Sequence, residues 1–375
     1  MIIGIDGNEA NLKNRVGVNQ YCFELLWGIQ KLQDEWKSKH HVIVFLKNKP
    51  LEDLPYETEN FEYKILPGNN VWILKKLTPY LLFSKDKPDI FFSPSHYVPL
   101  TGLMPRICSI MDLGFLNFST QFKKMTLWQL KMWSAYSIIV SKAIIAISNS
   151  TKQDIVRHFP FASKKTYVTH LAYDNQKYNI NVSEKDVRRI REKYSIVGDY
   201  ILFLSTLKPS KNVDGLIDAY KEIIKDFPQT KLVIAGKKGW MYESIYKKVE
   251  KLELRENIIF AGFVEENDKP AFFKGAKVFV LPSFWEGFGL DVLNALACGI
   301  PAVLSNVGSL PEVAGDAGIY VDPKDVNSIS EGVKKVLNMD EIEYNKLSNL
   351  GLRQIIKFSW LKTAKDTIKI LEETK

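Results

Sequence analysis

A glycine-rich loop with a single carboxylate lies in the C-terminal half of the chain, and its spacing suits phosphate binding. Residues 282–301 read PSFWEGFGLDVLNALACGIP, so that Glu286 precedes Gly287 and Gly289, and a helical pattern starts at Leu290. Glycines let backbone N–H groups approach an anion, and the start of the helix adds positive potential. Two glycines in a loop also suit a plain strand-to-helix turn, so that reading stays open.

Lys211 stands at the start of another predicted helix, where a cation opposes the helix dipole. A bound anion would remove this conflict, whereas a solvated lysine is the structural alternative. Lys208 precedes it by three residues and could supply a second positive charge.

The other reactive side chains form no recognisable metal or redox pattern. The chain has five histidines and three cysteines, which show no ligand spacing, no Cys-x-x-Cys pair and no Asp-x-Asp motif. We therefore expect neither a metal nor a cofactor, and a reducing compartment. His96 follows a predicted strand end and is either a structural histidine or a group that faces the second substrate.

Composition and charge narrow the class of protein further. The 375 residues are 46% hydrophobic and 25% charged, which is typical of globular domains. No segment resembles an export leader or a membrane span, so we expect a cytoplasmic location. The net charge of +8 lies mainly in residues 1–180, which hold 22 basic against 15 acidic residues.

A basic, tryptophan-containing region is concentrated between residues 64 and 165, with 14 Lys and Arg against 4 acids. Within it, residues 121–133 read QFKKMTLWQLKMW, which predicts an amphipathic basic helix suited to an anionic membrane surface. A core-facing helix with a solvated lysine side is the alternative. Nucleic acid is not expected as a partner because no recognition motif accompanies the charge.

Short apolar runs alternate with helical patterns along the whole chain, which favours parallel α/β sheets. We expect strands near 2–5, 42–46, 62–66, 89–92, 106–110 and 143–147, and then near 200–204, 231–235, 257–260, 277–281, 301–304 and 318–321. Residues 171–197 contain no clear strand and are predicted to link two domains. The fold class is therefore α/β, with two doubly wound Rossmann-like domains facing each other across a ligand-binding cleft.

Several motifs in the second half resemble glycosyltransferase family 4, a group of retaining enzymes with the GT-B fold. Beyond the EGFGL and ACGIP segments of residues 282–301, the similarity includes four stretches, which are 204–212 (LSTLKPSKN), 232–236 (LVIAG), 260–264 (FAGFV) and 309–318 (SLPEVAGDAG). The resemblance implies an N-terminal acceptor-side domain at 1–180, a nucleotide-sugar domain at 181–357, and a terminal helix at 358–375 that can return to the first domain.

The same resemblance implies roles for individual residues. Glu286 would hold the donor sugar and Lys211 would stabilise the leaving diphosphate, as the two catalytic residues. The donor would also contact the loop Gly287, Phe288, Gly289 and Leu290, and further residues Gly17, Thr206, Lys208, Gly236, Phe263, Val264 and Asn294. Acceptor-side candidates are His96, Met111 and Asp112. The family transfers sugar by same-face attack, for which neither a metal nor a second carboxylate is needed.

The sequence departs from the family pattern in three respects. Asn294 replaces a glutamate that holds ribose hydroxyls, Thr206 and Ser210 stand where an arginine is usual, and Met111 replaces the histidine of a His-Asp pair. We expect a metal-independent retaining hexosyltransferase that uses a nucleoside-diphosphate sugar and a glycan, lipid-linked or small-molecule acceptor, peripheral at the inner membrane face. The alternative is a catalytically weak nucleotide-sugar-binding or scaffold subunit with the same fold.

Overall fold

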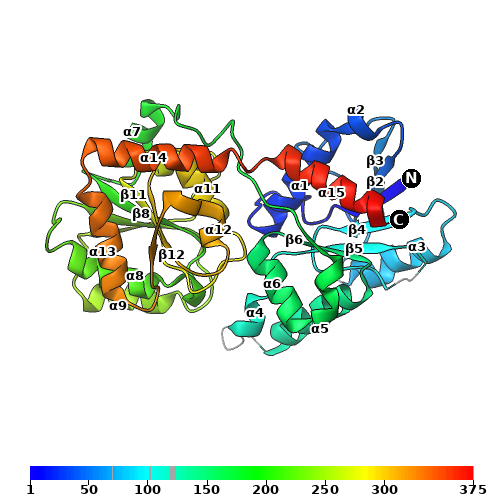
Figure 1. Ribbon diagram of the computed structural model, residues 1–375, viewed down its shortest axis with the longest axis horizontal. Coiled ribbons are helices and arrows are strands. Elements are labelled where there is room, and N and C mark those ends of the chain that lie inside the picture. The colour runs from blue at the N-terminus through cyan, green and yellow to red at the C-terminus, as the bar shows by residue number, and fades with distance from the viewer. Residues whose placement is uncertain (70, 101–102, 119–123, 375) are drawn as a thin grey trace. The chain divides into compact units, whose positions relative to one another are not determined.

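The chain forms two compact α/β units in the computed structural model, which describes residues 1–69, 71–100, 103–118 and 124–374 (Figure 1). The first unit comprises Met1–Ala172 and Phe358–Lys375, and the second comprises Tyr173–Lys357. The boundary therefore lies eight residues before the expected one at 180. The predicted cleft between the domains stays a prediction.

The N-terminal unit is built around a seven-stranded parallel sheet in the order β3-β2-β1-β4-β5-β6-β7. Its strands are β1 (Ile2–Asp6), β2 (His41–Leu46), β3 (Phe61–Ile65), β4 (Ile90–Ser93), β5 (Arg106–Ile110), β6 (Ala143–Ala146) and β7 (Thr166–Val168). Six of these were predicted. The seventh was missed because its three residues, at the edge of the sheet, are too few to show a periodic pattern.

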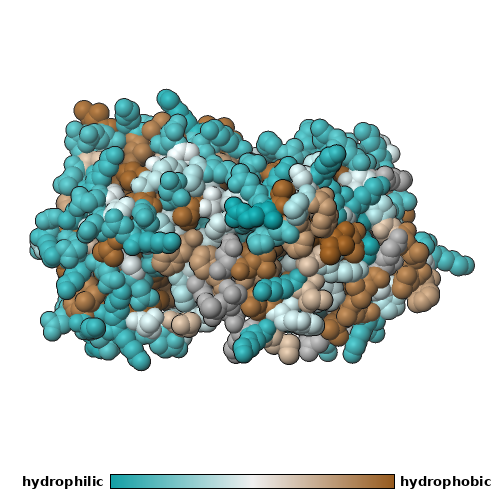
Figure 2. All heavy atoms as spheres, turned by 60° about the horizontal axis from the view of Figure 1, so that its bottom comes forward, coloured by the Kyte–Doolittle hydropathy of each residue, from teal (hydrophilic) through white to brown (hydrophobic). Residues whose placement is uncertain are grey.

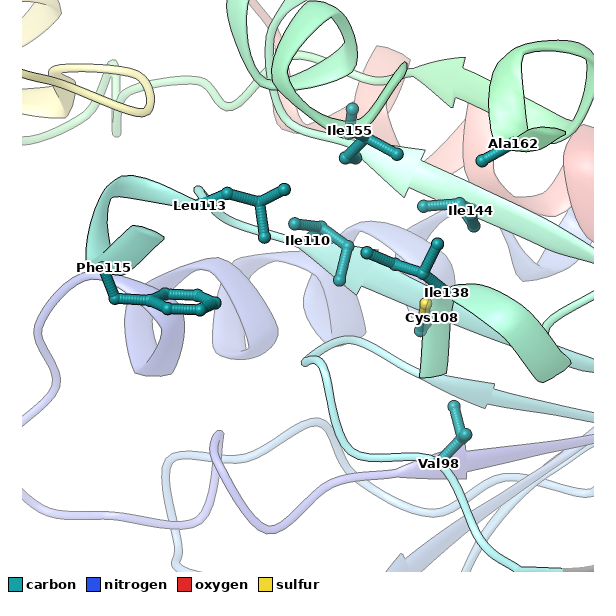
Figure 3. Close-up of a cluster of buried hydrophobic side chains, with 10 residues drawn as sticks. Val98, Cys108, Ile110, Leu113, Phe115, Ile138, Ile144, Ile155 and Ala162 are labelled. Carbon is teal, nitrogen blue, oxygen red and sulfur yellow. The ribbon is translucent and has the colours of Figure 1, made fainter. Parts of the chain in front are cut away.

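Helices α1 (Val18–Lys31), α2 (Gln33–Trp36), α3 (Thr78–Phe83), α4 (Gly114–Asn117), α5 (Lys124–Val140), α6 (Asn149–His158) and α15 (Trp360–Thr374) belong to this unit, with a π-helical turn at Ile73–Leu77 and a 3-10 turn at Pro160–Lys165. Figure 3 shows one of its apolar clusters, in which Ile138 of α5 and Ile155 of α6 lie against Cys108 and Ile144 of the sheet. Burial of such side chains fixes the helices that flank the sheet.

The C-terminal unit has a six-stranded parallel sheet in the order β10-β9-β8-β11-β12-β13. The strands are β8 (Tyr200–Leu204), β9 (Lys231–Ala235), β10 (Ile258–Gly262), β11 (Val278–Leu281), β12 (Ala302–Ser305) and β13 (Gly318–Val321). All six coincide with predicted strands to within one or two residues. The strands β8, β9, β11 and β12 are almost wholly apolar and buried, as central strands of a parallel sheet must be when helices cover both faces.

The helices of this unit are α7 (Glu184–Lys193), α8 (Val213–Ile223), α9 (Glu243–Lys251), α10 (Lys269–Lys274), α11 (Leu290–Ala297), α12 (Leu310–Ala314), α13 (Val326–Leu337) and α14 (Glu341–Ile355), with 3-10 turns at Pro209–Lys211 and Gly315–Ala317. Helix α14 was not predicted, although Asp340 and Glu343 form a capping box at its start.

The prediction that residues 171–197 form a linker is wrong for most of that segment. Tyr178 is buried and donates a 2.6 Å hydrogen bond to Glu266, and Arg189 and Lys193 of α7 each lie 2.9 Å from Asp268. These contacts attach the segment from Tyr173 onward to the C-terminal unit, because its apolar and charged groups find partners there.

Candidate functional site

The order of strands in the C-terminal unit brings two predicted loops side by side. Strands β8 and β11 are parallel neighbours, with Val278 opposite Ile201, although about 75 residues separate them in sequence. The strand order reverses at this pair, because β9 and β10 lie beyond β8 and β12 and β13 lie beyond β11. Loops that leave the carboxyl ends of strands at such a switch point are the usual ligand-binding position of doubly wound sheets.

The loop after β8 and the loop after β11 are in direct contact. The backbone N–H of Phe284 donates to the carbonyl of Ser210 at 2.9 Å, and the ammonium of Lys211 pairs with Oε1 of Glu286. Ser283 Oγ donates to the same oxygen at 2.8 Å. The side chains of Lys211 and Glu286 are only 13% and 9% exposed, so the two groups of predicted importance form one enclosed ion pair.

The backbone of Glu286 is held by the turn that follows β12. Ser309 donates to the carbonyl oxygen of Glu286 from its backbone N–H at 3.2 Å and from its hydroxyl at 3.1 Å. Gly308 has a φ of 59°, and a Cβ there would lie 2.5 Å from that same oxygen. The sequence similarity at 309–318 gave these residues no role, and the structure shows that they position the Glu286 loop.

Gly289 ends the loop in the left-handed region, with φ 88° and ψ 53°, and immediately precedes α11. A side chain there would be strained, and its Cβ would lie 2.8 Å from Leu310. No side chain caps the start of α11, and the Val292 N–H donates to the Gly289 carbonyl at 2.9 Å, so an anion at this helix start would meet the N–H groups that precede Val292. Phe288 is buried at 3% exposure, so that any donor contact from it would involve its backbone.

The remaining predicted donor residues lie in the loops that follow β8, β9 and β10. The Lys208 ammonium lies 5.2 Å from the centre of the Trp240 ring, and Thr206 is half-buried in the loop that follows β8. Val264 is buried, whereas the Phe263 side chain is 45% exposed just after β10. Their contacts with a donor stay predictions.

Gly236 has a clear structural reason to be glycine. Its φ is 142°, a Cβ would lie 1.8 Å from the carbonyl oxygen of Ser205, and its N–H already donates to Gly262 at 2.7 Å. A contact between Gly236 and a donor would therefore have to use its Cα or its carbonyl oxygen.

Asn294 is buried on α11 and donates to Oδ1 of Asp291 at 3.3 Å. Burial raises the pKa of the Asp291 carboxyl, and the nearby Lys269 ammonium opposes that rise.

The N-terminal unit has its own switch point between β1 and β4. Gly17 starts α1 with a φ of 53°, and a Cβ there would meet nothing within 4 Å. Asn19 in the first turn of α1 donates at 2.5 Å to Glu9, which lies in the loop between β1 and α1, and burial raises the pKa of the Glu9 carboxyl. Burial also raises the pKa of Asp6 to about 6. Glu9 was not predicted as a site residue.

The three acceptor-side candidates lie after β4 and β5. His96 has a pKa lowered to about 4 by burial, and its Nε2 is without a hydrogen-bond partner among the described residues. The Asp112 carboxylate accepts from the Gly114 N–H at 2.8 Å, which is a turn-forming contact, and the Met111 carbonyl accepts from Thr151 at 3.1 Å. Their roles toward an acceptor are untested predictions.

Among the residues that the structure describes, no group of three or more His, Cys, Asp or Glu side chains is arranged to hold a metal ion. The same residues include no helix with the length and apolar character needed to cross a bilayer.

Comparison with known proteins shows what the second unit is similar to. Residues 186–353 match the family model described as glycosyl transferases group 1. The chain is 29% identical over 344 residues to O-antigen chain mannosyltransferase B of Escherichia coli, covering 91% of this chain and 85% of that protein. It is 36% identical over 225 residues to the serotype-specific mannosyltransferase WbdA of Escherichia coli, but this match spans only 28% of WbdA.

The fold extends over both units. The Anabaena protein Alr3699/HepE, solved in complex with UDP-glucose, matches with a TM-score of 0.75 at 16% identity and covers 99% of each chain. Such a likeness shows the GT-B fold, which confirms the predicted fold class. The family match at residues 186–353 shows that the second unit is similar to the group 1 glycosyltransferases, as the sequence motifs predicted.

Proposed function

We propose that the chain is a retaining, metal-independent hexosyltransferase that takes its sugar from a nucleoside diphosphate. The observation that carries the proposal is the enclosed Lys211–Glu286 pair at the glycine-rich start of α11. A diphosphate that binds at the first turn of α11 would accept hydrogen bonds from backbone N–H groups there. The Lys211 ammonium lies beside this position and would neutralise the charge that builds up as the diphosphate leaves.

Glu286 would then be free to accept hydrogen bonds from hydroxyls of the donor sugar. Its carboxylate now takes hydrogen bonds from Lys211 and Ser283, so the sugar hydroxyls would replace part of this shell. Mannose is the first sugar to test, because two of the relatives that match this chain are named mannosyltransferases. UDP-glucose is the second, because a structure with the same fold contains it.

The acceptor is proposed to be a glycan or a lipid-linked glycan, since the relative that is matched over 85% of its length is named O-antigen chain mannosyltransferase B. We propose that the acceptor binds at the ends of strands β1 and β4 of the N-terminal unit, where Glu9 and His96 lie. We also propose that the exposed side of α5 rests on an anionic membrane surface at the cytoplasmic face, where Met125, Trp128 and Met132 are 72%, 60% and 53% exposed.

The central test is release of nucleoside diphosphate from GDP-mannose, UDP-glucose and ADP-glucose, with and without an oligosaccharide acceptor, in the presence of EDTA. We expect one donor to be consumed. Lys211→Ala should lower kcat/KM by about 100-fold or more, as loss of one transition-state charge contact does. Lys225→Ala is the control, because its ammonium pairs with Glu222 at an exposed position.

Removal of the lysine also leaves the Glu286 carboxylate enclosed without its cation. Lys211→Ala should therefore reduce the free energy of unfolding by about 3 kcal/mol, which denaturant titration measures. Failure of the wild type to consume any donor, together with unchanged nucleotide binding by Lys211→Ala, would favour a scaffold subunit instead.

A further inference from the structure

Arg15 carries an enclosed guanidinium within an exposed stretch of the loop between β1 and α1. Its side chain is only 8% exposed, whereas residues 12–14 and 16–17 on either side are exposed. Enclosure of a charged group requires compensating partners, because desolvation of an ion is costly. The guanidinium is therefore expected to have a specific set of contacts.

These contacts involve three separate parts of the N-terminal unit. The two terminal nitrogens of Arg15 donate to the two carboxylate oxygens of Asp53, at 2.6 and 2.9 Å, and Nε donates to the Ala10 carbonyl at 2.8 Å. The guanidinium carbon also lies over the Phe23 ring of α1, 4.0 Å from its centre. The pair with Arg15 holds the pKa of the Asp53 carboxyl below its ordinary value. A planar group with forked donors suits this arrangement, and a lysine cannot reproduce it.

Asp53 belongs to the segment of residues 47–60 between β2 and β3, and other side chains also attach the β1–α1 loop to this segment. The side-chain oxygens of Asn8 and Asn11 accept hydrogen bonds from backbone N–H groups of residues 47 and 51, at 2.8 and 2.9 Å. Asn8 and Asn11 thus hold the first half of the loop, and Arg15 attaches the end nearest to α1.

Glu9 lies in the part of the loop that these attachments hold. It directly precedes Ala10, whose carbonyl accepts from Arg15, and its carboxylate accepts from Asn19 in the first turn of α1 at 2.5 Å. Movement of Ala10 or of the start of α1 would therefore displace the Glu9 carboxylate. Small displacements of a group that contacts a substrate have large effects on an enzyme.

We propose that Arg15, through its paired hydrogen bonds with Asp53, is a positioning residue that holds the Glu9 carboxylate in place for the acceptor. This assignment rests on the proposed function, which locates the acceptor at the ends of β1 and β4. Arg15 itself does not touch the acceptor in this assignment, because its donors are directed to Asp53 and Ala10. Its loss therefore affects use of the acceptor and not use of the donor.

The test is steady-state sugar transfer from the donor that the wild type consumes, with mannobiose as the varied acceptor. Arg15→Ala should raise the KM for mannobiose about tenfold and change kcat and the KM for the donor about twofold or less, since the placement of Glu9 is lost. Asp53→Asn should act in the same direction. Because the Asp53 side chain is 56% exposed, this variant also carries the test if Arg15→Ala does not fold.

A double-mutant cycle distinguishes positioning from a purely structural role. Glu9→Gln alone should raise the KM for mannobiose, and Arg15→Ala in that background should raise it further by about twofold or less. A structural role would give the same factor in both backgrounds. Arg15→Lys should recover only part of the wild-type behaviour, because an ammonium lacks the planar fork. Arg255→Ala is the matched control, since that arginine pairs with Glu250 at an exposed position of the other unit.

The outcomes separate this inference from the function on which it rests. An unchanged KM for mannobiose in Arg15→Ala and Asp53→Asn, or equal effects of Arg15→Ala with and without Glu9→Gln, would overturn the inference and leave the proposed function standing. If the wild type consumed a donor but transferred nothing to mannobiose, the acceptor assignment and the inference would fall together. If the wild type consumed no donor, the proposed function itself would fall.

Discussion

Single residues at the switch point of the C-terminal unit are held by contacts that leave little freedom. Glu286 is fixed through its backbone by Ser309 and through its side chain by Lys211 and Ser283. A carboxylate and an ammonium that are positioned before a ligand arrives require less reorganisation during reaction. The glycines at 236, 289 and 308 permit this arrangement, because a side chain at any of them would meet an atom within 3 Å.

Gly236 offers the sharpest test of this close approach. Gly236→Ala should prevent folding or reduce the free energy of unfolding by about 3 kcal/mol or more, because the new Cβ would lie 1.8 Å from the Ser205 carbonyl oxygen. Gly262→Ala is the control, since Gly262 also has a positive φ but nothing lies within 4 Å of its Cβ position. It should cost only about 1 kcal/mol. Equal stability of the two variants in urea titrations would contradict the clash.

Among the elements, α5 differs most from its sequence-based prediction. An amphipathic basic helix was predicted at 121–133, of which 121–123 lie outside the described residues. From Lys124 on, large apolar side chains occupy the exposed side together with the lysines, while Ser134, Ser137 and Ile138 are buried. Figure 2 shows hydrophobic residues mixed with hydrophilic ones on this face of the unit. The helix is therefore not divided into one apolar core side and one charged side.

Membrane contact through α5 can be tested with lipid vesicles. Co-sedimentation should be several-fold greater with vesicles that contain phosphatidylglycerol than with phosphatidylcholine alone, and it should fall with added salt. Trp128→Ser should reduce binding about tenfold, because it removes a large interfacial side chain. Ile342→Ser on α14 alters an apolar residue that is 80% exposed and should change nothing. Equal sedimentation of the two variants would argue against α5 as the membrane surface.

In the whole molecule, the N-terminal unit is completed by the end of the chain. Helix α15 packs along α1, where a Cβ on Gly28 would lie 2.8 Å from Ala364 and 3.0 Å from the Trp360 carbonyl oxygen. Thr363 of α15 donates to the carbonyl of His170 at 2.6 Å, and Lys365 pairs with Glu35 at 2.9 Å. The first unit is therefore discontinuous in sequence, with its last helix supplied by residues 358–375.

This arrangement predicts that damage to the α1–α15 contact affects one unit only. Gly28→Val should lower the stability of the N-terminal unit by about 2 kcal/mol or more through overpacking, and should leave the C-terminal unit unchanged. In calorimetry we expect one of two transitions to move, while nucleotide still raises the other. Lys31→Val introduces the same side chain at an exposed position of α1 and should have little effect. A single shifted transition in both variants would indicate that the units unfold together.

Much of the fold and part of the candidate site were determined by the sequence itself. Buried parallel strands need continuous apolar runs, so the pattern of such runs along the chain located twelve strands. The glycine-rich loop and Glu286 were also evident, because the turn before α11 needs glycine at a fixed spacing from the helix start. These features depend on neighbours in sequence, which is why local patterns identify them.

The tertiary structure alone decided which distant groups meet. The pairing of β8 with β11 brings Lys211 to Glu286, the turn after β12 brings Ser309 to the Glu286 backbone, and the return of α15 completes the first unit. Such facts escape a local pattern, because long-range pairing depends on how all the apolar faces are buried together.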